Sequence, residues 1–211
     1  MNAARKIMIV LVLLFPVTLF AQSNEIGIFE PTLNVQSTSL SDDPLINVDI
    51  DFDGQPGYGI SYNRYWTDHF STELAVQKLN ADTSLTFSGP AVSAKFDAGD
   101  IDLTTISGIA QWHFGAGRWV PYVGGGIVHV SGSANGPDDP TDPTSPVTKD
   151  DLESKTTFIA NAGIDWRITP RIAVSLDGRY FSYDAVAKED PRAEAINLDS
   201  TVLSVAVKFR F

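Results

Sequence analysis

The chain has 211 residues, no cysteine, and 26 acidic against 15 basic side chains, for a formal net charge of −11. This excess of acids argues against nucleic acid as a partner, because a phosphate backbone recruits positive charge. The absence of cysteine excludes a disulfide scaffold, a thiolate metal site and a thiol nucleophile.

The first segment has the pattern of a secretory signal. Arg5 and Lys6 precede an uncharged run from Ile7 to Phe20, and Ala21 offers a small residue for cleavage. A single membrane anchor is the alternative, but the run is shorter than the roughly 20 apolar residues that a spanning helix needs. We therefore predict that residues 1–21 are a signal peptide.

Residues 22–211 then form the mature domain, whose 13 basic and 26 acidic side chains give a net charge of −13. No stretch in this domain is apolar for long enough to form a spanning helix, so a membrane would have to be crossed by strands. Alternation of apolar and polar residues predicts eight strands, which in chain order are Ile26–Gln36, Gly57–Trp66, Phe70–Leu79, Leu103–Phe114, Val120–Val130, Phe158–Arg167, Ile172–Phe181 and Thr201–Phe211.

The connections between these strands alternate between short and long. The short ones are Thr67–His69, Gly115–Trp119 and Ile168–Arg171, and the long ones are Ser37–Pro56, Asn80–Asp102, Ser131–Thr157 and Ser182–Ser200. Outer-membrane barrels have short periplasmic turns and longer extracellular loops. We therefore predict an all-β fold, an eight-stranded antiparallel transmembrane β-barrel. A soluble periplasmic β-domain is the alternative, but it gives no reason for every long loop to lie at one end.

Aromatic residues mark both ends of the predicted strands. Residues near the short turns would form one interfacial girdle, made of Trp66, Trp112, Trp119 and Trp166 with Tyr62, Tyr65, Phe70, Phe114, Tyr122, Phe209 and Phe211. The candidates for a girdle at the opposite rim are Phe158, Tyr180, Phe181 and Tyr183. The alternative is that these aromatics are core residues of a soluble β-domain, where Trp and Tyr also favour strands.

The same alternation predicts which side chains line the lumen. If Trp112 and Trp166 face lipid, their sequence neighbours face inward. The predicted lumen-lining residues are Glu73, Gln77, Gln111, His113, Asp165, Arg167, Asp177, Arg179, Lys208 and Arg210. Two roles stay open for them. Opposite charges can satisfy each other in a barrel filled by its own side chains, or some of these groups can line a narrow permeation path.

The segment from Gly132 to Asp151 is rich in proline and acids and lacks apolar periodicity, which predicts an exposed loop. The paired acids Asp138 and Asp139 raise the question of a calcium site. The spacing lacks the alternating ligands and the fixed glycine of an EF-hand loop, so we expect a solvated acidic loop and no metal site.

Three histidines are the candidates for chemistry: His69, His113 and His129. None has a nucleophile elbow nearby, and Ser107, on the strand and face of His113, lies roughly 20 Å away along an extended strand. Three dispersed histidines without cysteine also make a poor zinc site. The run Gly124–Gly126 lies inside a predicted strand and opens no helix, so it indicates close packing or curvature and not a phosphate loop. We expect no catalytic residue, no metal and no cofactor.

Three segments of the predicted strands carry a family resemblance: Gln111-Trp112-His113-Phe114, then Pro121-Tyr122-Val123-Gly124-Gly125-Gly126-Ile127 after a short turn, and the terminal Phe209-Arg210-Phe211. They resemble the outer membrane protein W (OmpW) family of Gram-negative bacteria. The resemblance implies an eight-stranded barrel in the cell outer membrane and passive uptake of small hydrophobic molecules, which enter from outside and leave sideways into the membrane. No position here matches the family's apolar gate. A terminal aromatic such as Phe211 also resembles the signal that barrel-assembly machinery reads.

Two functions remain open. The first is a monomeric, narrow passive channel for small hydrophobic solutes, whose partners are outer-membrane lipid, the barrel-assembly machinery and the solute. The second is a non-transporting structural or adhesion barrel whose acidic extracellular loops bind a partner or cations. Neither requires enzyme activity, a cofactor or nucleic acid.

Overall fold

The computed structural model describes residues 23–35, 38–39, 47–88, 93–115, 117–136, 149–185 and 196–211. The expected signal peptide, residues 1–21, lies outside these ranges, as do residues 137–148 of the proline-rich segment. Within the described ranges, no helix is long and apolar enough to cross a membrane.

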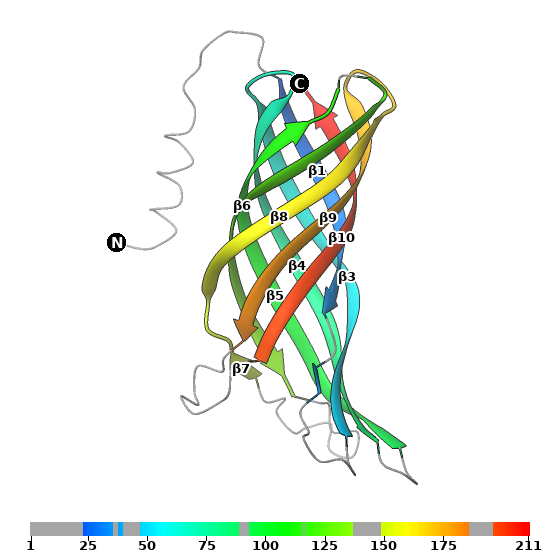
Figure 1. Ribbon diagram of the computed structural model, residues 1–211, viewed down its shortest axis with the longest axis vertical. Coiled ribbons are helices and arrows are strands. Elements are labelled where there is room, and N and C mark those ends of the chain that lie inside the picture. Colours follow the sequence, from blue (N-terminus) through cyan, green and yellow to red (C-terminus); the bar gives the residue numbers. More distant parts are fainter. Residues whose placement is uncertain are drawn as a thin grey trace, which may run out of the picture.

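The described residues form eight long strands and two short ones (Figure 1). The long strands are β1 (Asn24–Val35), β3 (Asn47–Tyr65), β4 (Phe70–Ser88), β5 (Ser93–His113), β6 (Trp119–Asn135), β8 (Lys155–Arg167), β9 (Ile172–Ala185) and β10 (Ile196–Arg210). The short strand β2 (Thr38–Ser39) pairs with β3, and β7 (Lys149–Asp151) pairs with β6.

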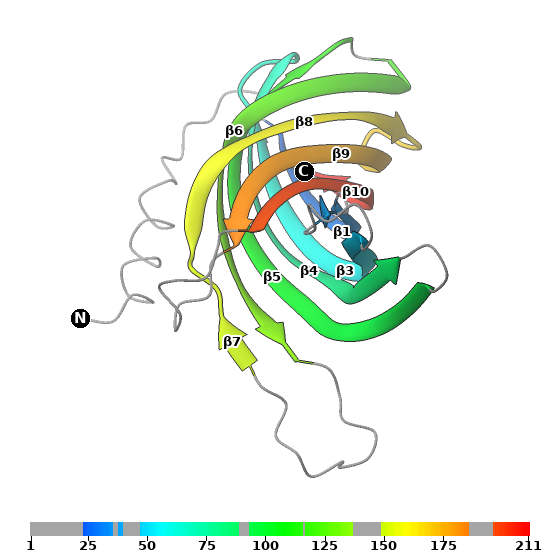
Figure 2. The ribbon, with the colours of Figure 1, turned by 60° about the horizontal axis from the view of Figure 1, so that its bottom comes forward.

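The long strands close into a ring. Each pairs antiparallel with the next long strand along the chain, and β1 pairs with both β10 and β3. The view in Figure 2 shows the strands curving around a common axis. Closure leaves no open edge between the first and last strands. The predicted fold, an eight-stranded antiparallel barrel, is confirmed.

Alternation along each strand decides which side chains face inward. In β10, Leu203, Val205 and Val207 are exposed on the outer face, whereas Ser204 and Lys208 are buried. Successive residues of a strand point to opposite faces of a sheet. An apolar outer face and a mixed inner face therefore follow directly from the sequence of this strand.

The two ends of the barrel differ. Short turns join β3 to β4, β5 to β6 and β8 to β9 at one end, where Phe211 also lies (Figure 1). Backbone hydrogen bonds tie the first strand to the last residue there, since the Asn24 N–H donates to the Phe211 carbonyl at 2.9 Å and the Phe211 N–H donates to the Asn24 carbonyl at 2.8 Å. We call this the turn end and the opposite one the loop end.

At the loop end the strands are longer than predicted. β3 begins at Asn47, β4 continues to Ser88 and β5 begins at Ser93, so the predicted connections Ser37–Pro56 and Asn80–Asp102 were wrong over much of their length. These segments are rich in aspartate and glycine, which disfavour strands. Two register shifts, one in the β3–β4 ladder and one in the β4–β5 ladder, also change the phase of the alternation.

The remaining long connections are also shorter than predicted. β6 continues to Asn135 and β8 begins at Lys155, within the predicted connection Ser131–Thr157, and β9 and β10 similarly shorten Ser182–Ser200. The segment Phe96–Asp102, expected to be a loop, belongs to β5. The shift in its register lies beside Gly99, whose φ of 98° is a conformation that glycine adopts readily.

Three strands reach beyond the others at the loop end and form what we call the arm: residues 47–54 of β3, 81–88 of β4 and 93–100 of β5 (Figure 1). Side chains opposite each other on paired strands share a face. One face of the arm is apolar and carries Val48, Ile50, Phe52, Leu85, Phe87 and Phe96, whereas the other carries Asp49, Asp51, Asp53, Asp82, Asp97 and Asp100. The arm is therefore an amphipathic three-stranded sheet.

Aromatic side chains gather at the turn end. Trp66, Phe70, Trp112, Phe114, Trp119, Trp166, Phe209 and Phe211 are exposed there, and their contact with lipid stays a prediction. The assignment was wrong for Tyr65 and Tyr122, which are buried, and for Phe181 and Tyr183, which were expected at the opposite rim but are fully buried in the interior. All four occupy inward positions of the strand alternation. Phe158 and Tyr180 are exposed on the outer face.

The glycine run in β6 offers a matched pair of substitutions. A Cβ on Gly126 would collide with the Gly108 carbonyl oxygen of β5 and lie 2.8 Å from the Ile109 Cα, whereas a Cβ on Gly125 would meet nothing closer than the Ile159 carbonyl oxygen at 3.7 Å. Overpacking costs about 1–3 kcal/mol. We expect Gly126→Ala to lower the free energy of unfolding by this amount in urea titrations, and Gly125→Ala to leave it nearly unchanged. Equal losses in the two variants would contradict the close-packing interpretation.

Candidate functional site

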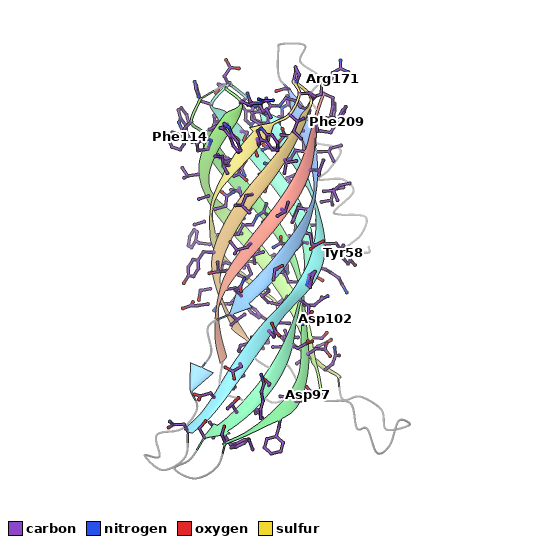
Figure 3. All side chains as sticks on the ribbon, turned by 90° about the vertical axis from the view of Figure 1, so that its right-hand side faces the viewer. Tyr58, Asp97, Asp102, Phe114, Arg171 and Phe209 are labelled. Atoms are coloured by element: carbon purple, nitrogen blue, oxygen red, sulfur yellow. The ribbon has the colours of Figure 1, made fainter. Side chains whose placement is uncertain are left out.

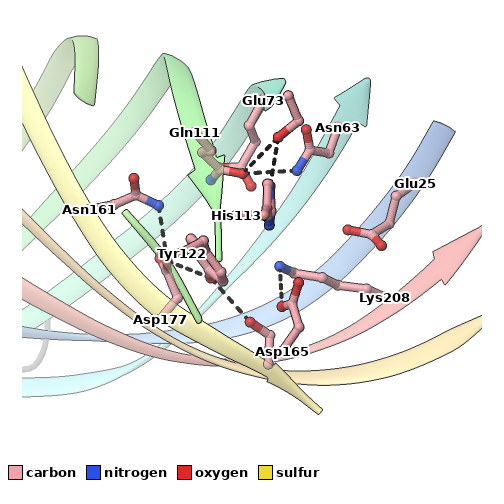
Figure 4. A network of polar contacts seen from close by, with 12 residues as sticks. Glu25, Asn63, Glu73, Gln111, His113, Tyr122, Asn161, Asp165, Asp177 and Lys208 are labelled. Carbon is pink, nitrogen blue, oxygen red and sulfur yellow. Dashed lines mark hydrogen bonds and ion pairs between the residues drawn. The ribbon is translucent and has the colours of Figure 1, made fainter. Parts of the chain in front are cut away.

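The predicted lumen-lining residues converge in the turn-end half of the interior (Figure 4). Eight of the ten are at most 5% exposed, namely Glu73, Gln77, Gln111, His113, Asp165, Asp177, Arg179 and Lys208. Arg167 and Arg210 lie at the turn end itself and are only partly buried. We call the eight buried residues and their hydrogen-bond partners the polar layer. Their part in permeation stays a prediction.

Arg179 connects opposite sides of the barrel. Its Nη2 donates to Glu73 Oε1 of β4 at 2.9 Å, and its Nε donates to Asp177 Oδ1 of β9 at 2.6 Å. The other carboxylate oxygen of Asp177 accepts hydrogen bonds from Tyr122 Oη at 2.8 Å and Asn161 Nδ2 at 3.1 Å. All five side chains are buried. In such a low-dielectric site these bonds are strong, and any member left unpaired would be costly.

A second buried ion pair lies nearer the turn end and joins the two strands that flank β9. Lys208 Nζ of β10 donates to Asp165 Oδ1 of β8 at 2.8 Å and lies 4.8 Å from the centre of the Tyr122 ring. At the rim, Arg210 Nη2 lies 3.3 Å from Glu25 Oε2 of β1. Of these pairs, Arg179–Glu73 spans the lumen, Lys208–Asp165 joins strands on either side of β9, and Arg210–Glu25 joins the adjacent strands β10 and β1. Together they place paired charges throughout the turn-end half of the interior.

A buried serine and histidine pair resembles part of a catalytic site. Ser71 Oγ lies 2.8 Å from His113 Nε2, and Ser71 also donates to Gln111 Oε1 at 3.4 Å. Both Ser71 and His113 are fully buried, and His113 Nδ1 has no hydrogen-bond partner among the described residues. A nucleophile needs access to substrate and a histidine held by a third group. The geometry therefore supports a packing role for this pair.

The other two histidines, His69 and His129, are exposed. His69 Nδ1 lies 2.9 Å from the His113 carbonyl oxygen at a short turn, and His129 Nδ1 lies 3.0 Å from Thr156 Oγ1 between β6 and β8. In the part of the chain that the structure describes, no three His, Asp or Glu side chains are grouped so that they could hold a metal ion.

Sequence reasoning missed several members of the polar layer. Asn63 Nδ2 donates to Gln111 Oε1 at 2.9 Å, and Ser71 and Asn161 are bonded to His113 and Asp177. Glu25, which pairs with Arg210, is buried beside the layer and was also missed. Each lies on the inward face of its strand, so the alternation that identified Asp177 would also have found these residues. Tyr122 was missed because its aromatic ring suggested the girdle.

The loop-end half of the interior is largely apolar, with Thr105, Ser133 and Ser200 as buried polar side chains. One cluster of buried side chains fills it, and we call it the apolar layer: Leu33, Leu79, Ala81, Leu103, Ile109, Val128, Val130, Leu152, Ile159, Phe181, Tyr183 and Val202. Phe52 and Ile101 pack against it, and Ile50 of the arm is also buried. The predicted charged lumen therefore covers only the turn-end half, and the apolar layer continues towards the apolar face of the arm.

The hydrogen-bonded ladder between β1 and β3 is interrupted. Their ladder stops after Phe29 and resumes at Thr32, so Glu30 and Pro31 have no partner in β3. Pro31 on β1 and Pro56 on β3 lack the N–H that a ladder requires. We call this interruption the wall gap. It lies where the two interior layers meet, because the Phe29 ring stacks 5.1 Å from the Arg179 guanidinium, while Leu33 of the same strand belongs to the apolar layer.

A groove of about 660 Å³ lies on the outer surface at the wall gap. Most of its lining is apolar and exposed, with Ile28, Tyr58, Leu176, Leu203, Val205 and Val207. Figure 3 shows Tyr58 projecting from the outer surface midway along the barrel. The lining also includes Phe29, Ser204 and Ala206, which occupy inward positions of β1 and β10.

Comparisons with known proteins give similarities over nearly the whole chain. Residues 7–211 match the family model described as outer membrane protein beta-barrel domain. No curated protein matches the chain. Among solved structures, the outer membrane protein OprG from Pseudomonas aeruginosa superposes with a TM-score of 0.59 at 14% identity, covering 90% of this chain and 95% of that chain.

Two further solved structures share the fold. Neisserial surface protein A (NspA) has a TM-score of 0.56 at 14% identity, covering 90% of this chain and 97% of that chain. The outer membrane protein AlkL in lipid bilayers has a TM-score of 0.54 at 15% identity, covering 93% of this chain and 95% of that chain. At these identities the likeness concerns the fold alone.

Proposed function

Because this chain belongs to the family of outer membrane proteins with a β-barrel domain, we propose that it is a narrow passive channel for small hydrophobic solutes. The expected outer-membrane location is confirmed, and the expected resemblance to the OmpW family is confirmed at the level of a small eight-stranded outer-membrane barrel. Barrels of this class have short turns on the periplasmic side and long loops outside. The turn end is therefore taken as periplasmic and the loop end as extracellular.

The observation that carries the proposal is the position of the wall gap. The apolar layer fills the extracellular half of the interior and the polar layer fills the periplasmic half. The wall gap and its apolar groove lie where the two layers meet. A hydrophobic solute is compatible with the first layer, but it would have to break buried hydrogen bonds to cross the second. Sideways exit through the wall gap avoids this cost.

The arm supports the extracellular side of this route. Its apolar face continues the inner face of β4, since Leu85 and Phe87 follow Leu79 and Ala81 at every second residue. Phe96, opposite Leu85 on this face, is 56% exposed. An exposed apolar surface of this kind can bind a hydrophobic solute outside the membrane. The solute would then meet the apolar layer without leaving apolar surroundings.

Permeation into vesicles tests the proposal. We expect purified barrels in liposomes to speed the transfer of a small apolar fluorophore loaded on an external carrier, and to leave the slow leakage of an encapsulated sugar and of potassium ions unchanged. The physical reason is that the polar layer closes the axial path to hydrated solutes, while the wall gap faces lipid. Liposomes that carry a heat-denatured preparation are the control. Sugar or ion leakage through the barrel, or no effect on the apolar fluorophore, would contradict the proposed route.

A non-transporting barrel that binds cations or a partner outside the cell is the second candidate. The acidic face of the arm, with Asp49, Asp51 and Asp53 at alternating positions of β3, favours it. Barrels that pass no solute class in the vesicle assay while their loops retain a ligand would establish it in place of the channel. Neither proposed function involves covalent chemistry. Both are compatible with a monomer that the barrel-assembly machinery inserts into the membrane.

A further inference from the structure

The periplasmic rim carries arginines that the transport route does not use. Each lies next to an aromatic or apolar residue of this rim: Arg64 near Trp66, Arg118 before Trp119, Arg167 after Trp166, Arg171 before Ile172, and Arg210 between Phe209 and Phe211. Arg167 and Arg210 are at inward positions, and Arg210 is paired with Glu25. The other three, Arg64, Arg118 and Arg171, are at the outer surface or in the turns, and we call them the rim arginines.

The rim arginines are placed among exposed girdle aromatics. The Arg64 guanidinium lies 4.5 Å from the centre of the Trp66 ring. Arg118 precedes Trp119, whose ring stacks on Trp166 with centres 5.5 Å apart. Arg118 and Arg171 are exposed, and Figure 3 shows Arg171 at the turn end, beyond Phe209. These cations therefore lie at the same level as the aromatic girdle or just beyond it.

The positive rim contrasts with the rest of the chain. The protein has 26 acidic and 15 basic residues, and the arm at the opposite end carries six aspartates on one face. In the three short turns, as far as they are described, Asp68 is the one acidic residue. Because charges of one sign gathered at one surface attract the opposite sign, the rim indicates an anionic partner on the periplasmic side.

We propose that the rim arginines bind the phosphate groups of anionic phospholipids in the inner leaflet of the outer membrane. Tryptophan girdles mark the headgroup level of a bilayer, so cations beside them meet lipid phosphates. The planar guanidinium binds phosphate in a bidentate manner. A lipid is favoured over an acidic protein because Arg64 is on the outward face of β3, next to an exposed tryptophan. The proposal rests on the orientation of the barrel and is independent of transport.

Tryptophan fluorescence provides a direct test. The chain has four tryptophans, all exposed at this rim, so quenching by brominated lipids reports on the proposed site without a label. In mixed vesicles we expect brominated phosphatidylglycerol to be preferred over brominated phosphatidylcholine by about fivefold, the scale of one basic side chain near an anionic surface. The preference should decrease in the double variant Arg118→Gln/Arg171→Gln, which leaves Arg64 in place, and it should fall towards one at about 0.5 M salt, where charges are screened.

A matched control separates the site from net charge. Lys78→Gln/Lys95→Gln removes two positive charges from exposed positions away from the turn end, Lys78 opposite Tyr58 midway along the barrel and Lys95 in the arm, and it should leave the lipid preference unchanged. The proposal would be overturned if the unaltered protein showed no preference for brominated phosphatidylglycerol over brominated phosphatidylcholine. It would also be overturned if both double variants lost this preference equally. If phosphatidylglycerol is not preferred but the protein retains polyglutamate through Arg118 and Arg171, the rim binds a protein partner and the lipid assignment is wrong.

Discussion

Replacing Arg179 with methionine should lower the free energy of unfolding by about 3–5 kcal/mol, because it leaves buried carboxylates without their cationic partner. Its guanidinium holds Glu73 at 2.9 Å and Asp177 at 2.6 Å, and all three side chains are buried. The loss should be measurable by urea unfolding of vesicle-inserted barrels, followed by tryptophan fluorescence. This effect should exceed that of Gly126→Ala.

Two further variants show whether the loss of stability comes from buried charges that have no partner. In the neutral triple variant Glu73→Gln/Asp177→Asn/Arg179→Met, no buried charge remains unpaired at this point, so most of the stability should return. Arg171→Met removes an arginine from an exposed turn and should change stability by less than about 0.5 kcal/mol. A triple variant as unstable as Arg179→Met alone would mean that lost packing, and not electrostatics, explains the effect.

Bridging the wall gap should slow the uptake of hydrophobic solutes about tenfold, equivalent to roughly 1.4 kcal/mol in the barrier to exit. Glu30 of β1 and Tyr58 of β3 flank the gap, and both are exposed on the outer face. The chain contains no cysteine, so Glu30→Cys/Tyr58→Cys can be joined specifically by a short reducible thiol crosslinker. Transfer of the apolar fluorophore is measured before crosslinking, after it, and after reduction, which should restore the original rate.

The control uses the same two strands where their ladder is continuous. Ile26 pairs directly with Tyr62, and both side chains point outward. Ile26→Cys/Tyr62→Cys can be crosslinked in the same way, but it joins strands that are already hydrogen-bonded, so uptake should not change. If the bridge across the gap leaves uptake unaltered, or if both bridges slow it equally, solutes leave by another path.

These two experiments address different layers of the same interior. The polar layer is expected to determine stability, because its charges are satisfied only by one another. The wall gap is expected to determine permeation, because it is the interruption of the β1–β3 ladder at which the apolar layer ends. A variant that alters one property while preserving the other would separate the structural role of the buried charges from the route of the solute.

Local alternation was sufficient to predict much of the fold. Val207 faces out and Lys208 faces in because successive side chains of a strand point to opposite faces, and this holds whatever the partner strands are. The three short turns and the strands around them could be predicted for the same reason. Alternation did not lead us to predict the strands of the arm, because register shifts change its phase there and aspartates cover one face of the paired sheet.

The arrangement of the interior was decided by the tertiary structure. Arg179 and Glu73 are 106 residues apart in sequence and meet only because the closed ring places β4 across from β9. Whether an inward side chain joins the polar or the apolar layer depends on its height along the barrel axis, which is set by the stagger of every strand pair. The sequence by itself therefore determined which face of a strand meets the membrane. Only closure of the barrel decided which buried groups meet one another and where the wall is interrupted.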